Sequence, residues 1–154
     1  GGYTHMANVL NIANYLLAKA AASEGERAKL SNLKLQKLLY YVQGFHAVLL
    51  KRPAFDDRIE AWMHGPVIPT VYHHYKDHGN AQIPAIMPLE EVEIDEETAE
   101  LVDEVFNVYA QHSAWHLRNL THEEDPWINR FDANSGSSEI KLEDLEAFFP
   151  SLLE

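Results

Sequence analysis

Apolar residues in the first fifty positions recur every three or four residues, as they do on one buried face of a helix. One such run covers residues 9–20 and stops before Gly25. A second run begins after Ser31, a favourable N-cap, and reaches Leu49 before a Lys-Arg-Pro sequence ends it. These patterns predict two helices, the second of them long and central to the fold.

The pattern changes in the middle of the chain. Residues 59–64 alternate apolar and polar positions with period two, which predicts a short strand. A Gly-Pro pair follows, and we expect a helix over about residues 66–78 because a first helical turn tolerates proline. A brief extended piece around residues 83–86 is expected to pair with the strand.

Helical periodicity returns in the last third of the chain. Asp95 and Ser113 are favourable N-caps for two helices that form a hairpin, and Asp125 with Pro126 is an N-cap and first-turn pair for another short helix. A polar loop at residues 134–138 precedes the final apolar helical run. The predicted fold class is therefore mainly α: a single compact helical domain with a small two-stranded β element.

Length and composition fit one globular domain, since the chain has 154 residues, of which 46% are hydrophobic and 23% charged. Residues 1–5 resemble an expression-tag remnant in front of Met6, so we expect the natural domain to cover residues 6–154. No apolar run approaches the roughly 18 residues of a membrane span, and no secretory pattern follows Met6. The chain has no cysteine. We therefore expect a cytoplasmic protein with no membrane partner.

The net charge of −12 argues against direct nucleic-acid binding, because such a field repels a phosphate backbone. The acidic residues crowd between Glu90 and Glu104, and no lysine or arginine occurs between Lys76 and Arg118. Two interpretations stay open for this stretch. It attracts a basic protein partner, or it is a solvated helix start whose acids favour the helix dipole.

Candidate chemistry is sparse. The serines lack the spacing of a nucleophile elbow, and the glycines are too scattered to cradle a phosphate. His74 and His78, and likewise His112 and His116, stand four residues apart, as metal-binding pairs do on a helix. A His-based metal-dependent enzyme or metal sensor is therefore the alternative function. Nine histidines in a short chain produce such pairs by chance, so we expect no metal, no cofactor and no catalysis.

Two segments carry a resemblance to a known family. Residues 33–41 read LKLQKLLYY, and residues 59–72 read IEAWMHGPVIPTVY. Together they resemble the signature of the Panacea domain, also called SocA-like or GepA-like, and the resemblance extends over roughly residues 8–131. It implies that residues 6–154 form a single Panacea domain.

The resemblance implies a bacterial antitoxin of a toxin–antitoxin system. Family members are typically encoded beside a small toxin gene, and they bind the cognate toxin protein directly and block it without chemistry of their own. Some work as adaptors that deliver the toxin to an AAA+ protease, and others lie in prophage-related islands. The resemblance leaves the adaptor role open for this chain.

The two segments also supply candidate contact residues. On the predicted long helix, three polar positions share one side and suggest a contact surface. The competing interpretation is that Gln36 and Lys37 bind backbone carbonyls near the turn after the strand and so hold the fold together. In the second segment a tryptophan is a candidate anchor, because such residues often dominate binding energy. The candidate partner-binding residues are Lys34, Lys37, Tyr41, Trp62, His64 and Tyr72.

Overall fold

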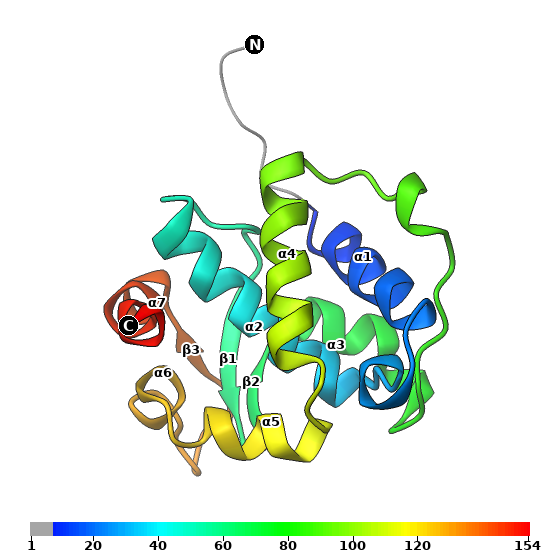
Figure 1. The fold of residues 1–154 in the computed structure, drawn as a ribbon. Coiled ribbons are helices and arrows are strands. Elements are labelled where there is room, and N and C mark those ends of the chain that lie inside the picture. The colour runs from blue at the N-terminus through cyan, green and yellow to red at the C-terminus, as the bar shows by residue number, and fades with distance from the viewer. Residues whose placement is uncertain (1–7) are drawn as a thin grey trace.

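A computed structural model describes residues 8–154, and the predicted tag remnant at residues 1–5 lies outside them. The described chain is mostly helical with a small sheet, which confirms the predicted fold class (Figure 1). The helices are α1 (Val9–Ala21), α2 (Asn32–Leu49), α3 (Pro69–Tyr75), α4 (Glu96–Tyr109), α5 (Ala114–Thr121), α6 (Asp125–Ile128) and α7 (Leu142–Phe148). The strands are β1 (Ile59–Trp62), β2 (Gly65–Val67) and β3 (Ser138–Ile140).

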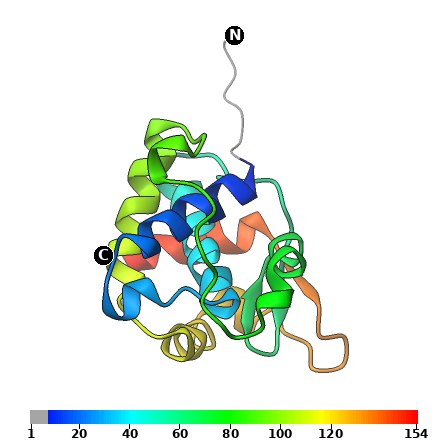
Figure 2. The same ribbon diagram turned by 90° about the vertical axis from the view of Figure 1, so that its right-hand side faces the viewer.

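Helix α2 runs through the middle of the molecule, which confirms the prediction of a long central helix. It contacts α1, α3, α4, α5, α7 and strand β2 (Figures 1 and 2). The hydroxyl of Ser31 accepts a hydrogen bond from the backbone N–H of Lys34 and caps its first turn, as predicted. Because neighbours surround α2, most of its side chains are buried whatever their polarity.

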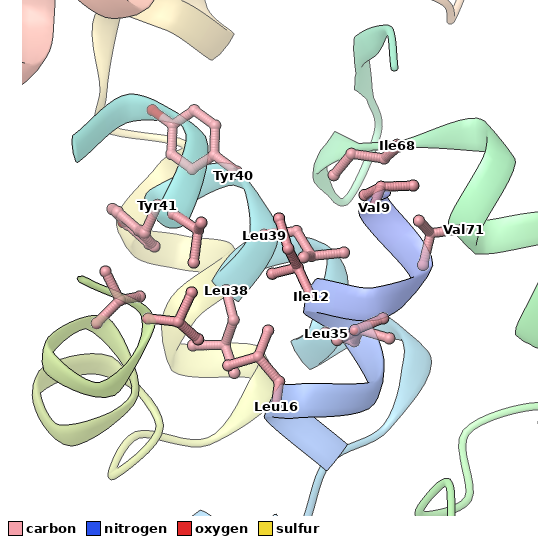
Figure 3. Close-up of a cluster of buried hydrophobic side chains, with 14 of the residues drawn as sticks. Val9, Ile12, Leu16, Leu35, Leu38, Leu39, Tyr40, Tyr41, Ile68 and Val71 are labelled. Carbon is pink, nitrogen blue, oxygen red and sulfur yellow. The ribbon is translucent and has the colours of Figure 1, made fainter. Parts of the chain in front are cut away.

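The hydrophobic core surrounds α2, and α1 is one of the elements that contribute most to it. Figure 3 shows Ile12 and Leu16 of α1 beside Leu35 and Leu39 of α2, and all four side chains are fully buried. Each such residue stabilises the fold by about 1.5–3 kcal/mol through the apolar surface it removes from water. The apolar periodicity of the sequence therefore identified the main core correctly.

The sheet has three antiparallel strands in the order β2-β1-β3. Strand β1 matches the predicted strand. The predicted two-stranded element is corrected in one respect, because β1 pairs with β2 and β3 and not with residues 83–86. Gly65 has φ of +107°, a conformation that favours glycine, and it reverses the chain directly after β1.

Because of this tight turn, helix α3 starts later than predicted. Helix α3 begins at Pro69, three residues later than expected, because Gly65–Val67 is used as a strand. Residues 83–86 form no strand; the N–H of Ile83 donates a single hydrogen bond to the carbonyl of Leu30. Farther along, Asp95 caps α4 by accepting a hydrogen bond from the N–H of Thr98, and Ser113 caps α5 by accepting one from the N–H of His116, as predicted. The predicted cap Asp125 is instead the first residue of α6, and Glu124 holds the cap position.

Candidate partner-binding surface

The turn between β1 and β2 projects two side chains into solvent. Met63 is 65% exposed, and His64 beside it is also exposed. Gly65 lies against the interior, since a Cβ atom at this position would stand 2.6 Å from Cε of Lys37 and 2.8 Å from Oγ1 of Thr121. The sequence thus has glycine at the position where the hairpin must both turn sharply and pack closely.

A groove of about 330 Å³ opens on one side of this hairpin, between the start of α2 and α3. The rings of Trp62 and Tyr72 meet edge to face, with centroids 5.0 Å apart. The groove is lined by Leu33, Trp62, Met63, His64, Tyr72 and Lys76, among others. The structure therefore brings three of the sequence-predicted contact residues, Trp62, His64 and Tyr72, to one place.

On the other side of His64 lies an exposed aromatic residue of α5. Trp115 is 54% exposed, and the guanidinium of Arg118 lies 4.4 Å from its ring centroid, within the range of a cation–π contact. Nε of Arg118 donates a hydrogen bond to Nδ1 of His64 at 3.2 Å. With Nδ1 accepting, Nε2 of the neutral imidazole carries the proton and can donate to a partner.

Trp115 and Arg118 were not among the contact residues predicted from the sequence. Their segment was predicted only as a short capped helix. The signal that could have found Trp115 is its position, two residues after the N-cap Ser113 and out of phase with the buried Leu117.

The other three candidate contact residues are corrected by the structure, because Lys34, Lys37 and Tyr41 are fully buried. Nζ of Lys34 donates to the backbone carbonyls of Glu26 and Ala110. The polar stripe of α2 therefore faces other parts of the chain and not solvent. The prediction that these three residues form an exposed contact surface was wrong.

The competing interpretation of this stripe is confirmed for Lys37, whereas Gln36 binds a backbone N–H and not a carbonyl. Nζ of Lys37 donates to the carbonyl of Pro66 at 3.0 Å, and Oε1 of Gln36 accepts from the N–H of Ile68 at 2.8 Å. Both bonds hold strand β2 and the start of α3 against α2. Buried side chains of α2 therefore fix the hairpin in position.

The α5–α6 junction holds the hairpin from the opposite side. Nε1 of Trp127 donates to the carbonyl of Trp62 at 2.7 Å, and the ring of His122 stacks on Trp127 with centroids 3.9 Å apart. The exposed residues of the turn thus stand on a support of hydrogen bonds and packed rings. Such pre-organisation lowers the entropy that a partner must overcome on binding.

Burial also changes the ionisation of this support. It lowers the pKa of Lys37 to about 7, and the positive charge of Arg118 acts in the same direction. Burial raises the pKa of Glu124 to about 7, although hydrogen bonds from the hydroxyls of Tyr40 and Tyr41 favour its charged form. Burial therefore brings the pKa values of both Lys37 and Glu124 close to neutral pH.

Neither histidine pair completes a metal site. The rings of His112 and His116 stack with centroids 4.4 Å apart, and His74 packs edge to face against Tyr75. Within residues 8–154, no three or more histidine or acidic side chains converge as ligands for a metal ion. The metal-dependent alternative thus has no centre in the described chain. Over the same residues, no helix has the length and apolarity of a membrane span.

The chain matches a known protein family. A family model described as "Antitoxin SocA-like, Panacea domain" matches residues 35–128, which include most of α2, the hairpin, α4 and α5. Antitoxin SocA of Caulobacter vibrioides (strain NA1000 / CB15N) is 46% identical to the chain over 68 residues. That match covers 44% of this chain and 35% of the SocA antitoxin, so the chain spans about a third of that relative's length. No solved structure matches the chain significantly.

Proposed function

The chain belongs to the SocA-like antitoxin family with the Panacea domain, and from this membership we propose that it neutralises a cognate toxin protein by binding it. The observation that carries the proposal is the family match across residues 35–128. The proposed mechanism is occlusion, in which the bound antitoxin covers the surface that the toxin needs. It requires no cofactor and no chemistry by the antitoxin. We further propose that residues 6–154 act as one Panacea domain in the bacterial cytoplasm.

We propose that the toxin contacts the hairpin face, which we define by its exposed and half-buried residues. These residues are Trp62, Met63, His64, Tyr72, Trp115 and Arg118. Aromatic residues, methionine and arginine are the types enriched at the centres of protein interfaces. An antitoxin must hold its toxin at low cellular concentration, which calls for about nanomolar affinity, near −12 kcal/mol. A few anchors on a rigid support can supply much of that energy.

The test combines toxin neutralisation with binding. The antitoxin is co-expressed in bacteria with the toxin from the adjacent gene, and dissociation of the purified pair is measured by biolayer interferometry. We expect the double variant Met63→Ala/Trp115→Ala to lose protection and to bind about 100-fold more weakly, since each anchor contributes about 1–2 kcal/mol or more. Both side chains are largely exposed, so the melting temperature should stay close to that of the wild type.

The matched control is Ile86→Ala/Ile128→Ala, which removes two exposed apolar side chains elsewhere on the surface. It should protect as well as the wild type. If the hairpin-face variant is folded and still protects fully, the toxin must bind another surface. If no neighbouring gene product is toxic or binds the chain, the antitoxin proposal itself fails.

The adaptor mechanism makes a different prediction from occlusion. An adaptor lowers the amount of toxin in cells that contain the AAA+ protease, whereas occlusion leaves the toxin intact in a stable complex. Immunoblots of the toxin during co-expression, in wild-type cells and in cells lacking the protease, separate the two. We expect an undegraded complex in both strains.

A further inference from the structure

A second groove, of about 320 Å³, lies between the C-terminal half of α2, helix α4 and the 3₁₀ turn Phe149–Leu153. We call it the α4 groove. Leu49, Val108 and Leu153 line it and are each about half exposed. Within residues 8–154, half of the most exposed large hydrophobic side chains belong to this groove, which singles it out as an unpartnered apolar surface.

The exposed edge of the groove is acidic. Helix geometry of about 100° per residue places Glu97, Glu100 and Glu104 along the solvent side of the lining residues Leu101 and Val108. All three glutamates are exposed, and α4 contains no lysine or arginine. The rim therefore presents one sign of charge beside an apolar floor.

One cation approaches this rim from the end of α2. Arg52 lies 3.2 Å from a carboxylate oxygen of Asp95 and 3.6 Å from one of Glu97. No ion pair of the described chain engages Glu100 or Glu104. The middle of the rim thus keeps its negative charge available to a ligand.

We propose that the α4 groove binds a basic amphipathic helix of another protein. Two helices form its walls, and a third helix can lay its apolar face between them with anchors three and four residues apart. Lysines or arginines beside that face would meet Glu100 and Glu104. The partner's charge follows from complementarity with the rim.

A second copy of the chain fits less well. Each copy carries a net charge of −12, and a symmetric contact through this groove would bring two acidic rims together. Leu33 of the hairpin groove and Leu49 of the α4 groove stand at opposite ends of α2, about 24 Å apart along its axis. The chain can therefore hold a ligand in the α4 groove while the hairpin face is occupied.

The probe is a synthetic amphipathic helix of leucine and lysine, labelled for fluorescence anisotropy. One control peptide has the same composition in scrambled order, and another replaces lysine with glutamate. We expect the leucine–lysine helix to bind at least about tenfold more tightly than either control, because only this peptide matches both floor and rim. No toxin is present, so the result does not depend on the proposed antitoxin function.

Two variants locate the binding site. Leu49→Gln/Val108→Gln removes the apolar floor without changing charge, and Glu100→Lys/Glu104→Lys reverses the rim. Each should weaken binding by about tenfold or more. Their matched controls, Ile86→Gln/Ile128→Gln and Glu90→Lys/Glu91→Lys, make the same changes at other exposed positions and should bind like the wild type.

Four outcomes would overturn the proposal. If the scrambled peptide bound as tightly as the leucine–lysine helix, net charge alone would explain the binding. If the glutamate peptide bound as tightly, the groove would not prefer a basic partner. Unchanged binding by the floor variant would place the peptide elsewhere. Light scattering that shows a dimer of the wild type but not of Leu49→Gln/Val108→Gln would make a second copy the occupant.

Discussion

The hairpin face and the α4 groove lie at opposite ends of α2 and are built in different ways. The hairpin face presents aromatic rings, a methionine, an imidazole and a guanidinium, and buried polar groups such as Lys37 and Gln36 hold it in place. The α4 groove is lined mostly by aliphatic side chains, with Phe45 and Tyr109 among them, and a row of carboxylates lies along its edge. Buried polar side chains of α2 therefore hold the hairpin face in place, whereas apolar side chains form the floor of the α4 groove.

The substitution with the largest expected effect unfolds the domain and so abolishes both the hairpin face and the α4 groove. Leu39→Asp buries a charge at the centre of α2, where the wild-type side chain is fully buried beside α1. We expect a loss of several kcal/mol in the free energy of unfolding, enough to unfold a domain of ordinary stability. Urea denaturation followed by circular dichroism measures it.

The control for this prediction is Leu49→Asp, on the same helix but half exposed. It should leave the domain folded. A folded Leu39→Asp variant with the wild-type melting temperature would contradict the assignment of α2 to the core.

A second change acts directly at the base of the hairpin. Gly65→Ala forces alanine into φ of +107° and brings Cβ against Lys37 and Thr121. Backbone strain and overpacking together predict a loss of about 2–5 kcal/mol. Gly25→Ala, at φ of +64° with open space around it, should cost only about 1–2 kcal/mol. Thermal melting compares the two variants, and equal losses would show that the close packing beneath the hairpin is unimportant.

Lys37, a buried polar residue that holds the hairpin face, should also affect how the stability of the domain depends on pH. Lys37 has a pKa of about 7 in the folded chain, against an ordinary lysine value of 10.5. Between these values the unfolded chain binds more protons than the folded chain, so the contribution of Lys37 to stability rises with pH. Lys37→Met lacks this rise. Urea unfolding at pH 7 and pH 9 measures the free energy of unfolding of both proteins. Its increase from pH 7 to pH 9 should be larger in the wild type than in Lys37→Met by an amount on the order of 2 kcal/mol.

Two features make this difference specific to Lys37. Lys34, whose pKa burial lowers to about 8, contributes a rise of its own, but it is present in both proteins and cancels. The hydrogen bond to Pro66 that the variant loses shifts stability by a similar amount at each pH where Lys37 is neutral. Parallel pH profiles of the two proteins would indicate that Lys37 stays charged when buried.

Much of the helical fold could be predicted from the sequence, because apolar periodicity and capping residues act locally. The core of α1 and α2 and the caps Ser31, Asp95 and Ser113 are of this kind. Strands β2 and β3 are only three residues long, too short for an alternating pattern to be visible. Their pairing depends on a turn at Gly65 and on a segment that returns from much farther along the chain.

The candidate sites were less predictable for a related reason. Periodicity treats polar residues as exposed, yet Lys34 and Lys37 bury long aliphatic chains and place their ammonium groups on backbone carbonyls. The α4 groove combines Leu49, Val108 and Leu153, which are distant in sequence and meet only in the folded chain. Trp62, His64 and Tyr72 were easier to find because one short motif contains them all.

The smallest expected effect concerns the acidic rim and tests whether the two surfaces work independently. Glu100→Lys/Glu104→Lys changes exposed side chains outside the first turn of α4, so stability should change by no more than about 0.5 kcal/mol. Exposed charges mainly govern the rate of encounter and contribute about 0–1 kcal/mol per pair to affinity. If the toxin binds the hairpin face, the variant should alter the association rate and its salt dependence while dissociation and growth rescue remain those of the wild type. Stopped-flow association at two ionic strengths and co-expression assays measure these quantities. Loss of neutralisation in this variant, with Met63→Ala/Trp115→Ala still protective, would reverse the assignment and place the toxin on the α4 side.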